Sequence, residues 1–177
     1  ATRLMEYLVD STKGYFMKVH LGVTTATYDS EGEVVTTKAV EGLTIEDVEQ
    51  ALSSFRGTIY QTPPMYSALK HQGKRLYELA RQGIDVEREP RKVNITSIEL
   101  TEFAPPSISL MVECGRGVYI RSLAHQLGEE LGCGGYLSEL VRTHSGPFNI
   151  DQAINIEHLE ATAESGDIDK WKQHLFP

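Results

Sequence analysis

The chain has 177 residues, of which 40% are hydrophobic and 24% charged, so it is long enough for one folded domain with a sizeable core and is neither a disordered tail nor a collagen-like repeat. It contains no run of roughly 20 apolar residues, and residues 1–10 lack the basic start and apolar run of a secretion signal, which predicts a soluble, cytoplasmic protein without a membrane partner. The net charge of −8 argues against a nucleic-acid partner, because phosphate binding depends on Lys and Arg.

The first third of the chain predicts a helix end followed by two strands. Residues 1–8 have apolar side chains at helical spacing but no cap before them, so we expect the end of a helix in a chain cut from something longer. Period-two alternation predicts a strand over 15–21. A turn follows, in which Asp29 bonds its own backbone and Gly32 tolerates a positive φ, and a second strand is predicted over 33–37.

One helix carries a complete start signal. Thr44 is predicted to cap a helix over 45–54, with Asp47 in the third position as the second half of a capping box. Its buried stripe is predicted to consist of Val48, Leu52 and Phe55.

The remaining elements alternate between strands and helices without βαβ order. After the rigid pair Pro63 and Pro64, the pattern predicts a short basic helix over 75–82, strands over 93–102 and 107–114, a helix over 119–131 after a glycine turn, a strand over 137–143 and a helix over 156–163. We therefore expect one α+β unit built on a largely antiparallel mixed sheet flanked by helices. The two cysteines, Cys114 and Cys133, lack metal or redox spacing and are predicted to be reduced thiols in the core.

Common catalytic devices are absent from the sequence. It has no complete dinucleotide fingerprint, no P-loop, no G-x-S-x-G elbow and no histidine pair at metal-ligand spacing, so we expect neither a metal nor a cofactor.

Basic charge is concentrated in one segment. Residues 66–92 carry seven Lys or Arg against four Asp or Glu, a net of +3, so the other 150 residues carry −11. Lys70, Lys74, Arg75 and Arg81 supply most of this excess, which fits either a solvated helix face or a surface for an anionic partner.

Tyrosines stand next to cations at three predicted junctions. The pairs are Lys13 with Tyr15, Tyr66 with Lys70, and Tyr119 with Arg121. If the last pair is still in an extended segment, period two points both side chains the same way. A ring that stacks on a base, beside a cation that holds a phosphate or carboxylate, suits a nucleobase pocket, although tyrosines in a core with a wet hydroxyl are the commoner case.

Four motifs in order resemble the TruB family of tRNA pseudouridine synthases, over essentially the whole chain. They are D-S-T-K-G-Y over 10–15, Q-T-P-P-M-Y-S-A-L-K over 61–70 with Gly73-Lys74 and Leu76-Tyr77 after it, G-V-Y-I-R-S-L over 117–123, and L-G-C-G-G over 131–135. The resemblance implies a partial pseudouridine synthase catalytic domain over 1–177, acting on the uridine in the T-arm loop of tRNA without metal or cofactor, and we expect a monomer.

The resemblance also implies roles for individual residues. Tyr15 matches the active-site tyrosine that packs against the target base and is a suspected proton-handling group. Tyr119 and Arg121 match the family's G-x-Y-I-R motif, whose arginine pairs with the catalytic aspartate. Leu140 matches an apolar residue against the flipped base. The substrate-binding set is completed by Lys13, Tyr66, Lys70, Lys74 and Arg75.

Three departures from the family pattern bear on function. The family's catalytic aspartate lies in a G-H-x-G-x-L-D-P segment that none of the chain's seven Asp residues matches, and we expect the C-terminal RNA-binding module of many members to be missing. Ala26 stands where a polar or acidic residue is expected. We therefore expect this chain alone to bind RNA without turnover. Two alternatives stay open: a non-catalytic RNA-binding or tRNA-folding module with the same fold, and an interaction domain without an RNA role.

Overall fold

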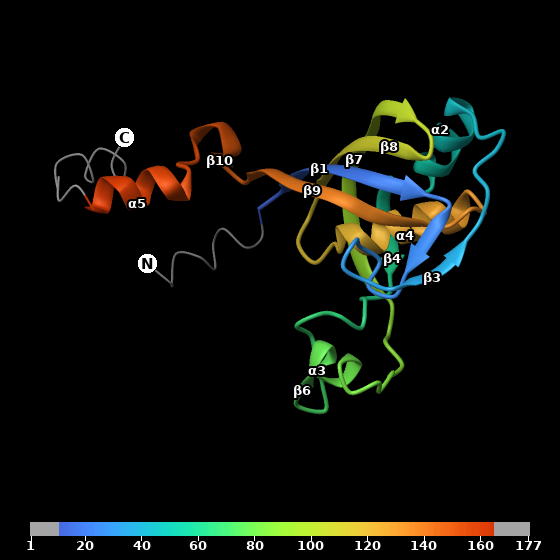
Figure 1. Cartoon of the computed structure of the whole chain (residues 1–177), viewed down its shortest axis with the longest axis horizontal. Helices are drawn as coiled ribbons and strands as arrows, with labels where there is room; N and C mark the ends of the chain where they lie inside the picture. The colour runs from blue at the N-terminus through green and yellow to red at the C-terminus, as the bar shows by residue number, and fades with distance from the viewer. Residues whose placement is uncertain (1–10, 165–177) are drawn as a thin grey trace.

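The computed structural model describes residues 11–164, and its main feature is a six-stranded sheet in which all neighbouring strands are antiparallel (Figure 1). The strands lie in the order β10, β9, β1, β8, β7, β4. Their bounds are Lys13–Leu21 (β1), Gly57–Gln61 (β4), Arg91–Ala104 (β7), Ser107–Cys114 (β8), Gly135–Ser145 (β9) and Phe148–Asn149 (β10). The predicted α+β class with an antiparallel sheet is confirmed.

The predicted alternation puts one face of the sheet into the core. Met17 and Val19 on β1 and Ile108 and Leu110 on β8 are fully buried, because alternate residues of a strand point to the same face. Strand β7 extends beyond the predicted 93–102 at both ends, since its pairing with β4 and β8 continues there. The helical spacing of Leu4, Met5 and Leu8 falls outside the described residues.

Helix α2 (Ile45–Ser53) begins as its sequence predicts. The Thr44 hydroxyl accepts from the Asp47 amide at 3.2 Å, and the Asp47 carboxylate accepts from the Thr44 amide at 2.9 Å. The Thr44 amide and the Thr44 hydroxyl both donate to the Asp47 carboxylate, and these two bonds lower the pKa of that carboxyl because they stabilise its charged form. Val48 and Leu52 are fully buried against the sheet and Phe55 is nearly so, as predicted.

Helix α4 (Ile120–Glu130) packs closely on β9. Leu123 and Leu127 are fully buried, and a Cβ added at Gly128 would lie 2.6 Å from the Gly135 Cα atom. Because a side chain has no room there, glycine at position 128 sets the distance between helix and strand. The helix begins at Ile120, so the segment from Tyr119 to Arg121 is not extended and period two does not relate the two side chains.

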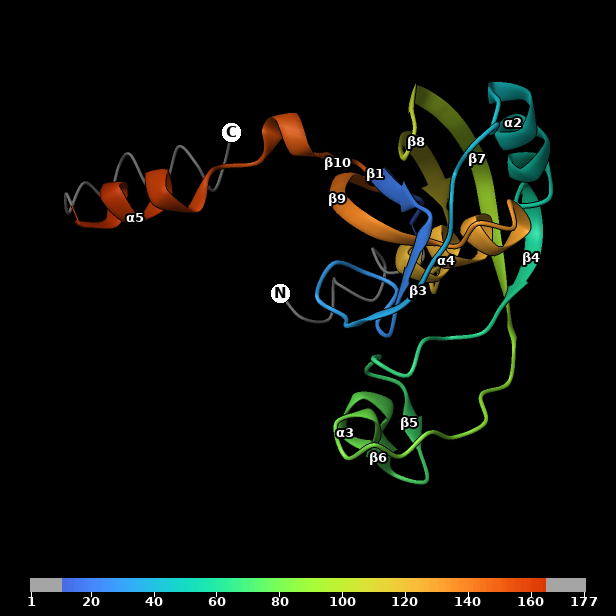
Figure 2. The same ribbon diagram turned by 45° about the vertical axis from the view of Figure 1, so that its right-hand side comes forward.

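Residues 62–90 form an insertion between β4 and β7 that lies beside the sheet (Figure 2). It contains β5 (Lys70–His71), β6 (Lys74–Arg75) and α3 (Leu76–Ala80). The basic helix predicted over 75–82 is therefore shorter and follows a hairpin. Gln72 and Gly73, with φ of 49° and 84°, form the two-residue turn of that hairpin.

A smaller hairpin and a terminal helix complete the described chain. Strands β2 (Val23–Thr25) and β3 (Val34–Thr37) pair with each other, and η1 (Ile150–Gln152) and α5 (Ile156–Glu164) follow β10. Gly32 does not adopt the positive φ that a glycine tolerates; a Cβ there would lie 2.7 Å from the Thr27 amide nitrogen, so space is the reason for glycine. No helix in the described chain is long and apolar enough to span a membrane. Cys114 and Cys133 are buried free thiols.

Candidate active site

The start of α4 is held by a buried glutamine from β4. Gln61 is 1% exposed, and its side-chain oxygen accepts from the Tyr119 amide at 2.7 Å while its nitrogen donates to the Tyr119 carbonyl at 3.1 Å. Tyr119 is the N-cap residue of α4, and its side chain makes no cap bond. The Gln61 side chain instead provides hydrogen-bond partners for the backbone amide and carbonyl of Tyr119 at the start of the helix. Sequence reasoning gave Gln61 no role.

Arg121, one residue inside α4, joins two distant segments. Its Nη1 atom lies 3.2 Å from Asp29 Oδ2, and its Nη2 atom donates to the Tyr66 carbonyl oxygen. Both side chains of the ion pair are about one-quarter exposed, so solvent screens the pair only in part. A guanidinium has five N–H donors, and the two bonds leave donors for a further acceptor.

Asp29 uses both carboxylate oxygens. Oδ2 faces Arg121, and Oδ1 accepts from the Thr27 hydroxyl and from the Glu31 amide at 3.2 Å. The predicted local turn around Asp29 is therefore present. The prediction did not include the pairing with Arg121, because the two residues are 92 positions apart.

The loop that carries Asp29 lies against β9. Asp29 forms an isolated parallel bridge with Leu137, and the Leu137 amide donates to the Tyr28 carbonyl at 2.9 Å. Tyr28 has a φ of 66°, which is unusual for a residue with a side chain. Ala26, the departure from the family pattern, precedes it in the same loop.

A second group of site residues lies on β1 and β9. Tyr15 is 8% exposed, and the guanidinium of Arg142, its register partner, lies 5.6 Å from the centre of its ring. Leu140, two residues before Arg142, is 45% exposed and is a diagonal neighbour of Tyr15 on the same face of the sheet. The ring of Tyr15 is thus close to an exposed apolar side chain and under an exposed cation.

Strand β9 links the two groups. Leu137 of this strand binds the loop that carries Asp29, and Leu140 and Arg142 of the same strand lie beside Tyr15. The structure therefore brings Arg121 together with Asp29 and Tyr66, and Tyr15 together with Leu140. That Tyr15, Tyr119 and Arg121 surround a single base stays a prediction.

The predicted substrate-binding cations are spread over two places. Lys13, at the start of β1, is half-buried and donates from Nζ to the Ser11 carbonyl at 2.8 Å. Lys70, Lys74 and Arg75 are exposed on the β5–β6 hairpin of the insertion. The guanidinium groups of Arg75 and Arg81 lie 5.7 and 5.5 Å from the centre of the Tyr77 ring. Such contacts fix the direction of the two cations.

A hollow of about 310 Å³ adjoins Tyr66, a partner of Arg121. It is lined by Tyr28 from the Asp29 loop and by residues of the insertion, among them Met65, Tyr66, Ile84 and Arg88. A second hollow of about 380 Å³ is lined by Lys70, Arg88 and Arg91 among others. Tyr15, Tyr119 and Arg121 line neither hollow.

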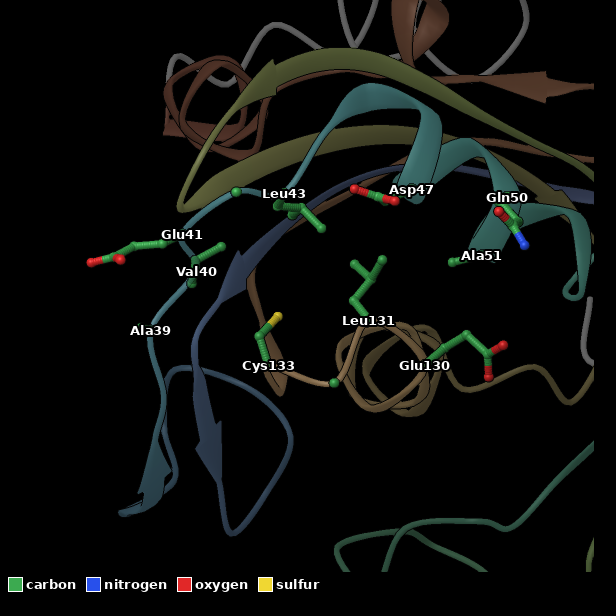
Figure 3. A pocket seen from close by; sticks show the side chains of 12 residues that line it. Ala39, Val40, Glu41, Leu43, Asp47, Gln50, Ala51, Glu130, Leu131 and Cys133 are labelled. Atoms are coloured by element: carbon green, nitrogen blue, oxygen red, sulfur yellow. The ribbon is translucent and has the colours of Figure 1, made fainter.

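A third hollow, of about 490 Å³, lies elsewhere, between α2 and the end of α4 (Figure 3). Two of its polar groups have partners: Asp47 binds Thr44, and the Cys133 thiol lies 3.3 Å from the Gly134 carbonyl. This hollow brings none of the predicted site residues together. Within residues 11–164, no three His, Cys, Asp or Glu side chains are grouped to hold a metal ion.

Family comparisons cover the whole chain. Residues 1–120 match the model described as TruB family pseudouridylate synthase, N terminal domain, and residues 121–177 match the tRNA pseudouridylate synthase B C-terminal domain. The boundary falls inside the first turn of α4, which packs on the same sheet as the elements before it.

Curated relatives and solved structures agree with these models. The chain is 52% identical over 166 residues to tRNA pseudouridine synthase B of Dehalococcoides mccartyi strain 195, covering 94% of the chain and 55% of the relative. It is 48% identical over 177 residues to the protein of that name from Pseudomonas fluorescens strain Pf-5, covering all of the chain and 58% of the relative. The chain thus spans little more than half the length of these relatives.

Among solved structures, a chain of a Cbf5-Nop10-Gar1 complex is similar with a TM-score of 0.65 and 28% identity, over 94% of this chain and 41% of that one. A chain of an H/ACA RNP bound to a substrate RNA containing 2′-deoxyuridine has a TM-score of 0.61 at 24% identity, over 94% of this chain and 40% of that one, and shows the fold alone.

Proposed function

The chain belongs to the TruB family of pseudouridine synthases, and on that premise we propose that the protein its gene encodes converts the T-arm uridine of tRNA, uridine 55, to pseudouridine. The observation that carries this proposal is the environment of Arg121. Its guanidinium is fixed at the start of α4 by Asp29 and the Tyr66 carbonyl and keeps donors for one more carboxylate.

The reaction needs a carboxylate nucleophile and a pocket for one base. The bond between N1 of uracil and C1′ of the ribose breaks, the base rotates, and a bond from C5 to C1′ forms while C5 loses a proton and N1 gains one. Because this is an isomerisation, no oxidant, reductant or second substrate is consumed. The base must first leave the stack of the RNA.

We assign the roles of the residues accordingly. Arg121 orients and keeps ionised the family's catalytic aspartate through charge-assisted bonds. Tyr15 packs against the base and is the candidate for moving its proton, with Leu140 as a second apolar contact. Tyr119, fixed by Gln61, closes the side of the site at the helix start. Asp29 is already occupied by three donors and serves as the partner of Arg121 rather than as the nucleophile.

The 177 residues contain no G-H-x-G-x-L-D-P segment, so we propose that they bind RNA but do not turn it over on their own. The partner is the T-arm stem-loop, contacted by a monomer in the cytoplasm. Lys70, Lys74 and Arg75 on the exposed hairpin, with Lys13 and Tyr66 nearer the sheet, are the proposed RNA contacts.

The test is a tritium-release assay on a T-arm stem-loop labelled at C5 of uridine, because forming the new bond expels that hydrogen. The gene product should release tritium, whereas residues 1–177 should bind the RNA and release none. Turnover by residues 1–177 would contradict the assignment of the nucleophile to a residue outside them.

A second candidate is a non-catalytic RNA-binding or tRNA-folding module, which the exposed cations of the β5–β6 hairpin support equally well because phosphate binding needs no catalytic group. The gene sequence separates the two candidates, because a gene without the aspartate segment favours the module. A gene product that binds the T-arm but releases no tritium would favour it as well.

A further inference from the structure

The Asp29 loop is attached to α4 at two consecutive residues. Asp29 pairs with Arg121, and the ring of Tyr28 stacks on the ring of His125, with centres 3.9 Å apart and planes 8° from parallel. Arg121 and His125 are four residues apart on α4, so they lie on the same face of the helix. The loop is therefore held by a charged contact and an aromatic contact one turn apart.

The backbone conformation of Tyr28 must be held in place by contacts with its surroundings. A positive φ in a residue with a side chain persists only where the surroundings hold it, and the φ of Tyr28 is 66°. Two hydrogen bonds contribute: the Tyr28 amide donates to the Thr25 carbonyl at 3.2 Å, and the Tyr28 carbonyl accepts from the Leu137 amide at 2.9 Å. The stacked ring of His125 provides the third restraint, and it is the restraint that comes from α4.

His125 contacts the Asp29 loop through the face of its ring, which stacks on Tyr28. In the described chain its Nδ1 atom is buried without a hydrogen-bond partner. Burial lowers the pKa of the imidazole, against the opposing effects of Glu129 and of a backbone hydrogen bond at Gly135. The lowered pKa favours the neutral form of the imidazole, whose flat face stacks on the Tyr28 ring.

We propose that His125 and Tyr28 are positioning residues: their stacked rings hold the loop on α4 so that Asp29 stays in register with Arg121. The inference rests on the proposed function, because its effect on catalysis passes through Arg121. Removing either ring should leave RNA binding unchanged and lower the rate of the chemical step.

The experiment uses the gene product and compares Tyr28→Leu with Tyr28→Phe, which keeps the ring. Tyr28→Leu should lower kcat about 3- to 10-fold with KM unchanged within about 2-fold, and Tyr28→Phe should retain the wild-type kcat. His125→Leu and His125→Phe should repeat this contrast and replace the first pair if Tyr28→Leu fails to fold.

A double-mutant cycle separates positioning from general stability. In an Asp29→Asn background, Tyr28→Leu should change kcat by less than about 1.5-fold, because the residue that it positions is already disabled. Wild-type kcat in both leucine variants, or losses that multiply in the double variant, would overturn the proposal.

Amide exchange gives a readout that does not depend on activity. Exchange of the Leu137 amide, which donates to Tyr28, should accelerate in Tyr28→Leu and stay slow in Tyr28→Phe. If the wild-type gene product forms no pseudouridine, the proposed function alone is rejected. If the exchange rate of the Leu137 amide is unchanged in Tyr28→Leu, the positioning role is rejected.

Discussion

At the scale of single residues, Asp29 and Arg121 carry the most weight in this site. The Asp29 carboxylate accepts hydrogen bonds from three donors, and the Arg121 guanidinium donates to two acceptors. The bond between them joins the Asp29 loop to α4. Hydrogen bonds to charged groups contribute more than neutral ones, so losing the charge of Asp29 releases Arg121 from its orientation.

Asp29→Asn should therefore lower kcat of the gene product about 10- to 100-fold, since a charge-assisted bond contributes about 1.5–3 kcal/mol. The affinity for T-arm RNA should stay within about 2-fold of the wild-type value. Asp151→Asn, an exposed carboxylate on η1, is the matched control and should leave kcat unchanged. Single-turnover tritium release measures the rates; equal kcat values for the two variants would argue against a role for the ion pair.

His125 predicts a pH dependence of stability. Its pKa is lowered below the ordinary value of 6.5 by burial, so the unfolded chain binds the proton more readily than the folded one. Stability from this residue is complete above about pH 6.5 and is lost as the pH falls from there toward the lowered pKa. When the pH is lowered from 7.5 to 5.5, the urea midpoint should fall further in the wild type than in His125→Phe. An equal fall in the two proteins would contradict a lowered pKa of His125.

At the scale of elements, local signals predicted the helices and strands but not the contacts between them. The capping box of Thr44 and Asp47 lies within four residues and was readable from the sequence, as was the alternation of β1 and β8. The Gln61 contact with Tyr119 joins residues 58 positions apart, so no local sequence pattern predicts it. The hairpin before α3 was missed because Gln72, a residue with no strong turn preference, adopts a positive φ there.

The contact of α4 with β9 gives a stability prediction. Gly128→Ala should destabilise the protein by about 1–3 kcal/mol or more, because the added methyl group meets the backbone of Gly134 and Gly135 rather than a side chain that can move. Glu130→Ala, on the exposed side of the same helix, should change stability by less than about 0.5 kcal/mol. Urea unfolding of both variants measures the difference, and equal midpoints would show that α4 can move away from β9.

At the scale of the whole molecule, charge is separated along the chain. A protein of net charge −8 carries its basic segment on an insertion outside the sheet, where Lys70, Lys74 and Arg81 are exposed. The basic character of this segment was readable from the sequence. Its secondary structure was not, since a hairpin and a short helix replace the single predicted helix. Total charge therefore says less about an RNA partner than the position of the basic residues does.

Replacing Lys70, Lys74 and Arg81 by Gln should weaken T-arm binding and make it less dependent on salt. Removing one cation that neutralises a phosphate reduces the slope of log K against log salt by about 0.7 to 0.9, so a reduction of about 2 to 3 is expected for the triple variant. Lys38→Gln with Arg56→Gln, two exposed cations outside the insertion, is the control and should keep the slope. An unchanged slope in the triple variant would favour a solvated face with no RNA role.

The most direct test of the account is the single-turnover rate of pseudouridine formation by Arg121→Lys in the gene product. Lysine keeps the charge but cannot hold Asp29, the Tyr66 carbonyl and a further carboxylate in one plane. We expect Arg121→Lys to form pseudouridine at least about 100-fold more slowly than Arg56→Lys, with both variants binding T-arm RNA as tightly as the wild type. A wild-type rate in Arg121→Lys would contradict the placement of the active site at the start of α4.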